Sequence, residues 1–301
     1  MRDKVSVVIP VYRNEDKFLR ILERNLKYLE GCEIVIVNDF PASKLNLKLP
    51  KVRNLVYIQN RKNLGFAGAV NLGIRSCSRK FVLLLNSDVE LVDGAVFSAL
   101  SRLKNDIFAV GIKQKEKDGF VGRNILFFKR GLFYHKTAGS QEDGITAWAE
   151  GGAVFFRKAD FLKIGGFCSL YSPFYWEDID LSYRAWKAGW RVVFYAESFM
   201  LHKHESTIGK YFKTLKIRSI SFRNQFIFCW LNLSDTDLWI KHFLYLFFNL
   251  VFFLIRDPVF LIGFFYALLR MPEVLKYRRL YSKFRKVSDR RILQVFKEQI
   301  R

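Results

Sequence analysis

The chain has 301 residues with a formal net charge of +22, and half of its residues are hydrophobic, including 31 phenylalanines. That length allows one large hydrophobic core or two modest ones. The charge is concentrated toward the C-terminus, because residues 203–301 contain 19 Lys and Arg against 7 Asp and Glu. A segment so basic and aromatic indicates a polyanionic partner, either nucleic acid or the anionic face of a membrane.

The four cysteines are far apart and form no C-x-x-C pair; they are Cys32, Cys77, Cys168 and Cys229. Their spacing argues against a disulfide framework or a zinc site and favours a reducing compartment. The apolar stretch Val5–Val11 is too short for the hydrophobic region of a signal peptide and is interpreted as a strand. We therefore expect a cytoplasmic protein.

Short apolar runs alternate with amphipathic segments in the first third of the chain. Strands are expected at Val5–Ile9 (stopped by Pro10), Glu33–Val37, Leu55–Ile58 and Phe81–Leu85. Helices are expected from Asn14 or Asp16 to Gly31, and over Phe66–Ser76. This order predicts an α/β fold with a mostly parallel, helix-flanked central sheet and right-handed crossovers.

The expected elements of residues 92–205 are less regular. They are a helix over Val92–Lys104, strands at Ile107–Ile112, Glu150–Phe156 and Arg191–Tyr195, a short helix ended by Gly165 and Gly166, and a helix that ends near Ala188 before Gly189. Residues 113–146 are rich in Lys and Gly and are predicted to be irregular.

Polar residues follow three of the expected strands, after Ile9, Val37 and Leu85. The carboxyl ends of parallel strands meet at one edge of the sheet, where α/β proteins bind ligands. After Leu85, the oxygens of Asn86–Asp88 suit a hard divalent cation and a phosphate. This pattern predicts a nucleotide site, although Asp88 as a helix N-cap is the alternative.

Six motifs occur in a fixed order: Val5–Tyr12, Val37–Asp39, Asn60–Gly73, Leu84–Asp88, Trp176–Asp178 and His202. With them, residues 4–205 resemble the family 2 glycosyltransferases, which are inverting, nucleotide-sugar-dependent enzymes of the GT-A fold. The N-x-G-F-A-G-A-x-N pattern, and Asn in place of the first Asp of D-x-D, are most similar to the rhamnosyltransferase-type branch. The resemblance implies a GT-A catalytic domain over 1–205, with a nucleotide-binding half at about 1–112 and an acceptor half at about 113–205.

The residues that the resemblance assigns to the donor are Pro10, Val11, Tyr12, Asp39, Asn63, Gly65, Asn71, Asn86, Ser87 and Asp88. Asp39 resembles the family's nucleobase contact, although an Asp two residues before Pro41 also suits a turn. The Gly-containing loop that opens the second helix can bring its backbone close to phosphate. A packing role is the alternative for Gly68 and Gly73.

A divalent cation, Mg²⁺ or Mn²⁺, is the cofactor that the resemblance implies. Held by Asp88, it would offset the charge that develops on the departing nucleotide diphosphate. Asn86 adds no charge, so this site has one anionic ligand fewer than a full D-x-D. The family pattern implies His202 as a further ligand; His204 is the competing candidate, and a packed or solvent-exposed imidazole is the alternative.

Trp176-Glu177-Asp178 is predicted to be the reactive element. Inversion needs one base to take the proton of the acceptor hydroxyl, and a carboxylate in the first turn of a helix is kept ionised by the helix dipole. The family motif places the base at Asp178, while Asp180 is expected to pair with Arg184 at i+4. The predicted acceptor contacts are Trp176, Glu177 and Gly152. Plain N-terminal helix charges are the alternative for the three acidic residues.

The tail over residues 206–301 is predicted to be helical, basic and Phe-rich. Its apolar segments Phe243–Ile255 and Val259–Leu269 fall short of the about 20 residues that span a bilayer, and Arg256-Asp257-Pro258 separates them. We expect the tail to lie in the plane of the anionic inner face of the cell membrane. That location suits a polyprenyl-linked glycan acceptor and surface polysaccharide assembly. Packing onto the catalytic domain, or a homodimer interface, is the alternative.

The expected donor is a nucleoside-diphosphate sugar, with dTDP-rhamnose first and UDP-sugars second. A sugar-phosphate nucleotidyltransferase has a similar sheet, but its Gly- and Arg-rich loop after the first strand is replaced here by Pro10–Asn14. A non-enzymatic, nucleic-acid-binding protein is disfavoured, because the basic residues lie among long apolar runs rather than on a soluble stripe.

Overall fold

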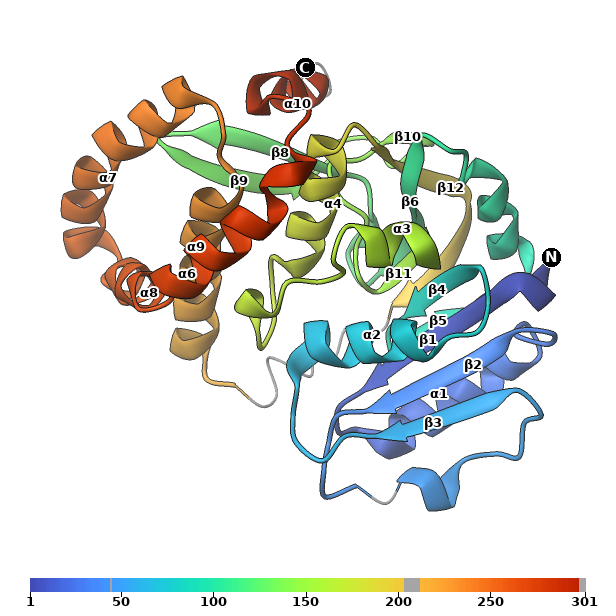
Figure 1. Cartoon of the computed structure of the whole chain (residues 1–301). Coiled ribbons are helices and arrows are strands. Elements are labelled where there is room, and N and C mark those ends of the chain that lie inside the picture. Colours follow the sequence, from blue (N-terminus) through green and yellow to red (C-terminus); the bar gives the residue numbers. More distant parts are fainter. Residues whose placement is uncertain (44, 203–211, 298–301) are drawn as a thin grey trace.

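The computed structural model describes residues 1–43, 45–202 and 212–297 (Figure 1). The strands are β1 (Val5–Val11), β2 (Glu33–Asn38), β3 (Leu55–Gln59), β4 (Phe81–Leu85), β5 (Val89–Leu91), β6 (Ile107–Glu116), β7 (Gly119–Val121), β8 (Asn124–Lys129), β9 (Leu132–Thr137), β10 (Gly144–Ile145), β11 (Ala153–Arg157) and β12 (Arg191–His202). The α-helices are α1 (Glu15–Leu26), α2 (Gly65–Ser76), α3 (Lys158–Lys163), α4 (Glu177–Lys187), α6 (Thr214–Asn232), α7 (Thr236–Arg256), α8 (Val259–Leu268), α9 (Met271–Tyr281) and α10 (Asp289–Lys297). Short 3₁₀ helices lie at Arg2–Lys4, Leu45–Lys48, Ala95–Arg102, Ser169–Tyr171 and Ser282–Phe284.

The central sheet has the strand order β10-β12-β6-β11-β4-β1-β2-β3, and β8 and β9 form a separate hairpin. Strands β1, β2, β3 and β4 are parallel to one another, and β6 is parallel to β12. Strand β11 is antiparallel to both of its neighbours, β4 and β6. The carboxyl ends of β1, β2, β4, β6 and β12 therefore meet the amino end of β11 at one edge. The predicted α/β fold with a mostly parallel sheet is confirmed.

Both faces of the sheet are covered, which is why its strands are almost continuously apolar. Helix α2 packs on the face that carries Val8 and Val35, and α1 packs on the opposite face, which carries Val7 and Ile34 (Figure 1). At Gly73 of α2, a Cβ atom would come within 2.6 Å of Val8 Cγ1. Glycine there allows the helix to approach the sheet closely, which supports its packing role.

The expected end of the first strand at Pro10 is wrong. Pro10 lies inside β1 and pairs with Val37 of β2. The pairing of β1 with β4 ends at Val8, so β1 has a strand on only one side at Pro10, and the missing N–H is tolerated as on an edge strand.

The expectations for residues 92–146 also need correction. The expected helix over Val92–Lys104 is present as a 3₁₀ helix over Ala95–Arg102, and β5 (Val89–Leu91) lies just before it. Residues 113–146, expected to be irregular, contain the end of β6 and all of β7, β8, β9 and β10. The β8–β9 hairpin escaped detection because its buried residues are consecutive (Ile125 and Leu126, then Leu132 and Phe133) and show no alternation.

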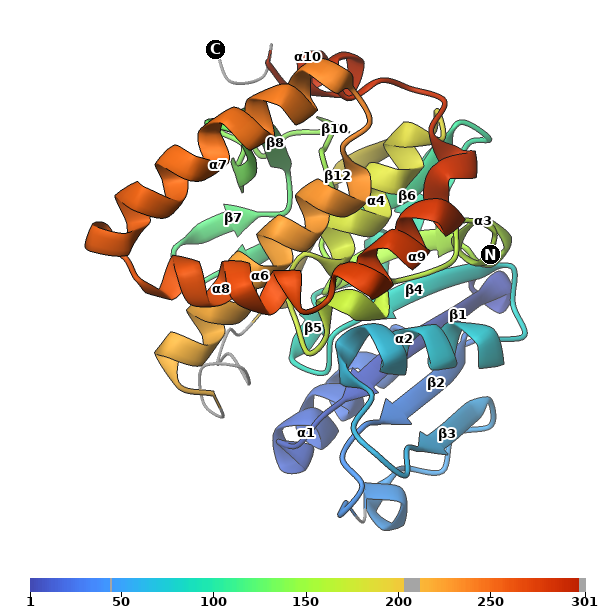
Figure 2. The same cartoon turned by 60° about the vertical axis from the view of Figure 1, so that its left-hand side comes forward.

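The C-terminal helices complete the core of the protein. All residues of α6 from Asn224 to Asn232 are buried, and the apolar ones join the cluster that contains the sheet residues Leu84 and Val154. Helix α6 lies against α4 and against the 3₁₀ helix Ser169–Tyr171, and α9 packs on α6 (Figure 2). The boundary predicted at residue 205 falls outside the described residues.

Helix α7 corrects the prediction that both apolar segments are too short to span a bilayer. It has 21 residues and, in the described part of the chain, is the one helix long and apolar enough to cross a membrane by length and composition. The helix begins at Thr236, well before Phe243. Its first turns were not predicted because they contain the polar residues Asp237, Lys241 and His242. The predicted break before α8 is confirmed.

Two polar side chains attach α7 to the turn between β8 and β9. The Nδ1 atom of buried His242 lies 2.7 Å from the carbonyl oxygen of Gly131, and Asn249 Nδ2 donates to the carbonyl oxygen of Arg130 at 2.9 Å. Trp230 of α6 donates to the other ring nitrogen of His242 at 3.0 Å. These contacts explain why polar residues interrupt an otherwise apolar helix.

A buried ion pair connects α10 to α4. Asp289 accepts hydrogen bonds from Lys187 Nζ at 2.6 Å and from the Tyr183 hydroxyl at 2.6 Å. The side chains of Lys187 and Asp289 are only 2% and 0% exposed. Removal of either partner would leave the other charge buried without compensation.

We expect Asp289→Ala to lower the free energy of unfolding by about 3–5 kcal/mol, because the Lys187 ammonium stays buried. Asp16→Ala is the control, since it removes the exposed partner of Lys48 at 3.2 Å and should cost at most about 1 kcal/mol. Urea unfolding followed by circular dichroism measures both. Equal, small losses would show that the buried pair does not hold the C-terminal helices.

Candidate active site

A cavity of about 630 Å³ lies at the sheet edge where the strand ends meet. Of the residues predicted for the site, those that line it are Pro10, Val11, Tyr12, Asp39, Asn63, Gly65, Asn86, Ser87, Asp88, Gly152, Trp176, Glu177, Asp178 and His202. The volume is in the range typical of small-molecule sites. Residues far apart in sequence converge here because their strands are parallel.

Asp39 organises the loop that precedes α2. Its Oδ1 atom accepts hydrogen bonds from Asn60 Nδ2 at 2.7 Å and from the backbone N–H of Leu64 at 2.8 Å. Both bonds end on Oδ1, and Asp39 is one of the residues that line the cavity. Burial raises the pKa of Asp39, although these hydrogen bonds oppose the shift.

The loop before α2 is a tight turn that opens toward the cavity. Asn63 Oδ1 accepts the N–H of Gly65 at 2.8 Å, and Gly65 has a positive φ of +71°. Glycine adopts this left-handed conformation without the penalty that a Cβ atom brings.

Asn71 differs from the other predicted donor residues, because it does not line the cavity. Its amide donates to the carbonyl oxygen of Phe167 at 2.8 Å and accepts the N–H of the same residue at 2.9 Å. Asn71 therefore fixes α2 to the turn after α3. Its contacts in the structure are structural rather than directed at a ligand.

His202 lies between two carboxylates at the end of β12. Its Nε2 atom is 3.4 Å from Asp88 Oδ1, and its Nδ1 atom is 3.3 Å from Glu116 Oε1. Burial by itself lowers the pKa of His202, but the hydrogen bond to Asp88 and the charges of Asp88, Glu116 and Glu150 outweigh it and raise the pKa. The contact with Glu116 orients the ring so that Nε2 faces Asp88.

The Asp88–His202 pair fits a divalent cation as two of its ligands. Two neighbouring ligands of an octahedral ion of this size lie about 3 Å apart, close to the observed separation. Among the described residues, no group of three or more His, Cys, Asp and Glu could hold a metal ion by itself. Ligand oxygens from a bound diphosphate would complete the sphere. His204 lies outside the described residues.

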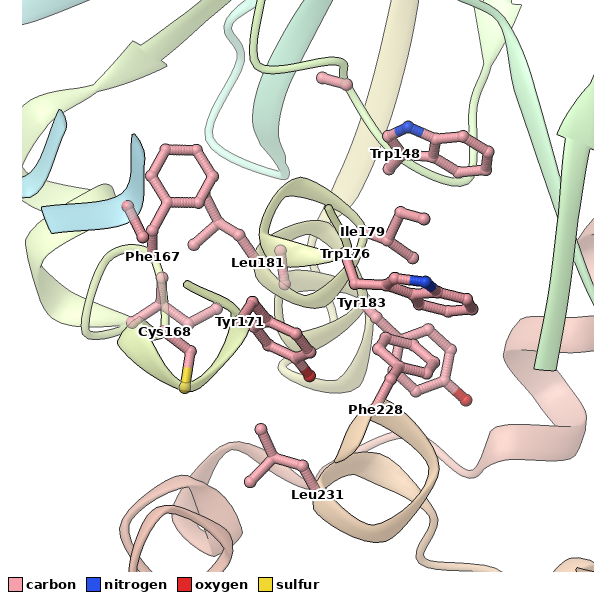
Figure 3. Close-up of a cluster of buried hydrophobic side chains, with 14 of the residues drawn as sticks. Trp148, Phe167, Cys168, Tyr171, Trp176, Ile179, Leu181, Tyr183, Phe228 and Leu231 are labelled. Atoms are coloured by element: carbon pink, nitrogen blue, oxygen red, sulfur yellow. The ribbon is translucent and has the colours of Figure 1, made fainter. Parts of the chain in front are cut away.

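The segment before α4 has an unusual backbone. Tyr175 and Trp176 have φ values of 72° and 76°, a left-handed conformation that is costly for residues with side chains. Asn224 of α6 holds this turn, because its Nδ2 atom lies 2.8–2.9 Å from the carbonyl oxygens of Tyr171, Phe174 and Tyr175. The Trp176 ring packs on Phe228 of α6, at 5.1 Å between ring centroids (Figure 3).

Asp178 sits in the first turn of α4 with its carboxylate in the cavity wall. It accepts the N–H of Ile179 at 2.8 Å and that of Gly151 at 3.4 Å. Burial nevertheless raises the pKa of Asp178 to about 6. The backbone N–H groups at the helix start lower this pKa, as expected, but desolvation outweighs them.

The neighbouring acidic residues of α4 have different surroundings. Burial raises the pKa of Glu177 well above its usual value, and its Oε2 atom has no hydrogen-bond partner among the described residues. Asp180 pairs with Arg184 at 2.8 Å, as predicted, and both side chains are buried. Asp180 is thus structural, while Glu177 lines the cavity.

Several cavity residues were missed by the sequence reasoning; they include Phe66, Gln114, Glu116, His135, Trp148 and Glu150. Gln114 and Glu116 alternate with Lys113 and Lys115 at the end of β6, a period-2 signal that a longer predicted strand would have revealed. Glu150 accepts hydrogen bonds from Gln114 Nε2 at 2.6 Å and Asn124 Nδ2 at 3.1 Å. Burial raises the pKa of Glu150 to about 7.

The fold is that of GT-A glycosyltransferases. Similar solved structures are GalNAc-T7 with UDP, GalNAc and Mn²⁺ (TM-score 0.60, 15% identity, 76% of this chain and 48% of that chain), the mannosyltransferase PcManGT of Pyrobaculum calidifontis with GDP-Man and Mn²⁺ (0.52, 14%, 99% and 85%), and S. aureus TarS with UDP (0.52, 18%, 81% and 70%).

The model of the family "Glycosyl transferase family 2" matches residues 6–165, and the chain belongs to this family. An uncharacterized glycosyltransferase of Rickettsia bellii is 35% identical over 92 residues, which are 29% of this chain and 13% of that protein. The pre-mycofactocin glycosyltransferase of Mycobacterium tuberculosis is 25% identical over 212 residues, 68% of this chain and 43% of that protein. The chain thus spans less than half the length of these relatives.

Proposed function

We propose that this protein transfers a sugar, with inversion, from a nucleoside-diphosphate donor to a hydroxyl group of a glycan. The observation that carries the proposal is that one cavity combines the Asp88–His202 pair with the partly buried carboxylate of Asp178. The first group suits a diphosphate and its cation, and the second suits a proton acceptor. Structures of the same fold contain UDP or GDP-Man, two of them with Mn²⁺.

The donor side is formed by Tyr12, Asp39 and the loop before α2. Tyr12 and Phe40 pack edge to face at 5.9 Å, with the Arg13 guanidinium 5.0 Å from the Phe40 ring centroid. This aromatic surface beside Asp39 suits a nucleobase, which can stack and accept or donate hydrogen bonds. The donors to test are dTDP-rhamnose, as the branch resemblance implies, and then UDP-sugars.

A cation, Mg²⁺ or Mn²⁺, would be held by Asp88 and His202. When bound, it supplies positive charge beside the departing diphosphate. Asn86 and Ser87 come from the same turn and add uncharged hydrogen-bonding groups toward the ribose or phosphates. Glu116 fixes the ring of His202 by its contact with Nδ1.

Asp178 is proposed to take the proton of the acceptor hydroxyl as that oxygen attacks the anomeric carbon. Its raised pKa makes it a better proton acceptor than an exposed carboxylate, while a value of about 6 leaves it mainly ionised at neutral pH. Trp176 offers an apolar face to the acceptor sugar. Glu177 and Gly152 complete the acceptor side.

The surface of α7 and α8 supports membrane association on the cytoplasmic side. Large apolar side chains are exposed along both helices: Ile240, Phe243, Leu244, Phe247, Phe248, Val251, Leu254, Ile255, Ile262, Phe265, Leu268 and Leu269. Exposed Lys213, Lys216, Arg270 and Lys276 lie on the elements next to them. A helix pair lying in the plane of an anionic membrane would bury this surface. A polyprenyl-linked glycan, used in surface polysaccharide assembly, is the acceptor that this location suits.

We expect Asp178→Asn to lower turnover by about 10²–10⁴-fold while donor affinity stays nearly unchanged, because the variant keeps the shape and loses the base. In the unmodified enzyme, turnover should rise as the pH increases through about 6, since only the ionised carboxylate accepts a proton. Steady-state kinetics between pH 5 and 8 measure both effects. Glu177→Gln should retain this pH dependence; its loss there would place the base at Glu177.

Asp88→Ala should weaken nucleoside-diphosphate binding about 100-fold, because several kcal/mol of charge stabilisation by the cation are lost. His202→Ala should weaken it less, since a neutral ligand supplies no charge. Asp93→Ala, in the same segment but outside the cavity, is the control. Calorimetric titration with and without Mn²⁺ and chelator measures the effects. Binding that is indifferent to chelator would contradict the metal assignment for both residues.

The double substitution Phe247→Glu and Phe248→Glu should abolish co-sedimentation with anionic vesicles and leave the fold intact, because the two side chains are 67% and 65% exposed. Leu47→Glu is the matched control, since Leu47 is 77% exposed near β2 and β3. Light scattering should show a monomer in detergent-free buffer for the double variant. A wild-type dimer that binds no vesicles would instead identify this surface as a homodimer interface.

A further inference from the structure

Gln114 on β6 presents an unpaired acceptor to the cavity. Its side chain is 1% exposed, and the residue lines the cavity. The Oε1 atom has no hydrogen-bond partner among the described residues. Buried acceptors are rarely left unsatisfied in folded proteins, so such an atom beside a ligand cavity indicates a donor supplied by the ligand.

The contact with Glu150 determines which end of the Gln114 amide faces the cavity. Nε2 donates to Glu150 Oε2 at 2.6 Å, while Asn124 Nδ2 donates to the other carboxylate oxygen at 3.1 Å. While Glu150 is ionised, the reverse orientation of the amide would place two acceptor oxygens against each other. Glu150 therefore holds Gln114 with Oε1 directed away from the carboxylate.

Gly152 lies next to both Gln114 Oε1 and the amide of Asn86. A Cβ atom at this position would lie 3.1 Å from Gln114 Oε1 and 3.2 Å from Asn86 Nδ2. The two side-chain atoms are therefore close enough together for one ligand hydroxyl, in the cavity beside Gly152, to reach both. A hydroxyl oxygen can accept from the Asn86 amide and donate to the Gln114 carbonyl at the same time.

We propose that Asn86, Gln114 and Gly152 form a binding site for one hydroxyl group of the donor's sugar, so that Gln114 contributes to the choice of sugar. This inference rests on the proposed function. Asn86 is in the same turn as Asp88, the proposed cation ligand, and Asp178 lines the same cavity. A hydroxyl held between the diphosphate side and the base belongs to the sugar that is transferred. Gly152 then lies where donor sugar and acceptor meet.

The test uses the full chain and calorimetric titration with Mn²⁺, without acceptor. The probes are UDP, dTDP and GDP, and the sugar conjugates of whichever diphosphate binds the wild-type protein. Gln114→Met keeps the length of the side chain and removes the carbonyl. Its affinity for the nucleoside-diphosphate sugar should fall about 5- to 100-fold, while the affinity for the bare diphosphate should stay within about twofold of the wild-type value.

Asn124→Leu is the matched control. It removes the other amide hydrogen bond to Glu150, but Asn124 is not among the cavity-lining residues. We expect the ratio of conjugate to bare-diphosphate affinity to stay at the wild-type value in this variant. A change of that ratio as large as in Gln114→Met would show that the effect comes from Glu150 and would overturn the proposal.

A second variant, Gly152→Ala, places a methyl group 3.1 Å from Gln114 Oε1 and 3.2 Å from Asn86 Nδ2, which crowds the proposed hydroxyl site and should cause the same selective loss. It tests the proposal if Gln114→Met fails to fold, as judged by thermal unfolding. Conjugates of deoxy sugars complete the test. A conjugate that lacks the bound hydroxyl should bind the wild-type protein more weakly than the conjugate of the complete sugar does. The Gln114→Met variant should bind these two conjugates with equal affinity. Unchanged affinity for the conjugate in both variants, or an equal loss of affinity for the bare diphosphate, would overturn this inference but not the proposed function. A wild-type protein that binds no diphosphate would overturn the proposed function and the inference with it.

Discussion

Parallel strand pairing determines where every polar group of the cavity lies. Because β1, β2, β4, β6 and β12 run in the same direction, their carboxyl ends reach one edge of the sheet. Strand β11, which runs antiparallel to its neighbours β4 and β6, then brings the segment before it, with Glu150 and Gly152, to the same edge. No local sequence signal places Asp39, Asp88 and His202 together; the sheet does.

Burial, more than helix charge, sets the proton affinities at this edge. Asp178 accepts two backbone N–H groups, yet the pKa of its carboxyl is about 6 because the side chain is removed from water. Glu150, held by two amides, reaches about 7 for the same reason. Helix α6 supplies much of the covering: Phe228 lies under the Trp176 ring (Figure 3). The C-terminal helices thereby contribute to the chemistry of the site as well as to its stability.

The sequence was sufficient to predict cavity residues that stand at a sharp change from apolar to polar residues. It was insufficient where burial or strand pairing determines which residues reach the cavity. Asp88 and Asp178 could be found because each stands at a sharp change from apolar to acidic residues. Gln114 could not, since its strand continues past the apolar run into alternating Lys and polar residues. Asn71 is a motif position outside the cavity lining, and its amide is hydrogen-bonded to the backbone of Phe167. The length of α7 could not be predicted, because its polar residue His242 is accommodated by tertiary contacts with Trp230 and Gly131 that the sequence does not reveal.

One part of what holds the turn before α4 does not depend on the side chains of the turn. Asn224 donates only to main-chain oxygens of Tyr171, Phe174 and Tyr175, so it fixes the path of the backbone whichever side chains the turn carries. Phe174 and Tyr175 both line the cavity. In evolution or in the laboratory, this segment can therefore exchange one set of cavity-facing groups for another while the geometry that positions Asp178 is preserved.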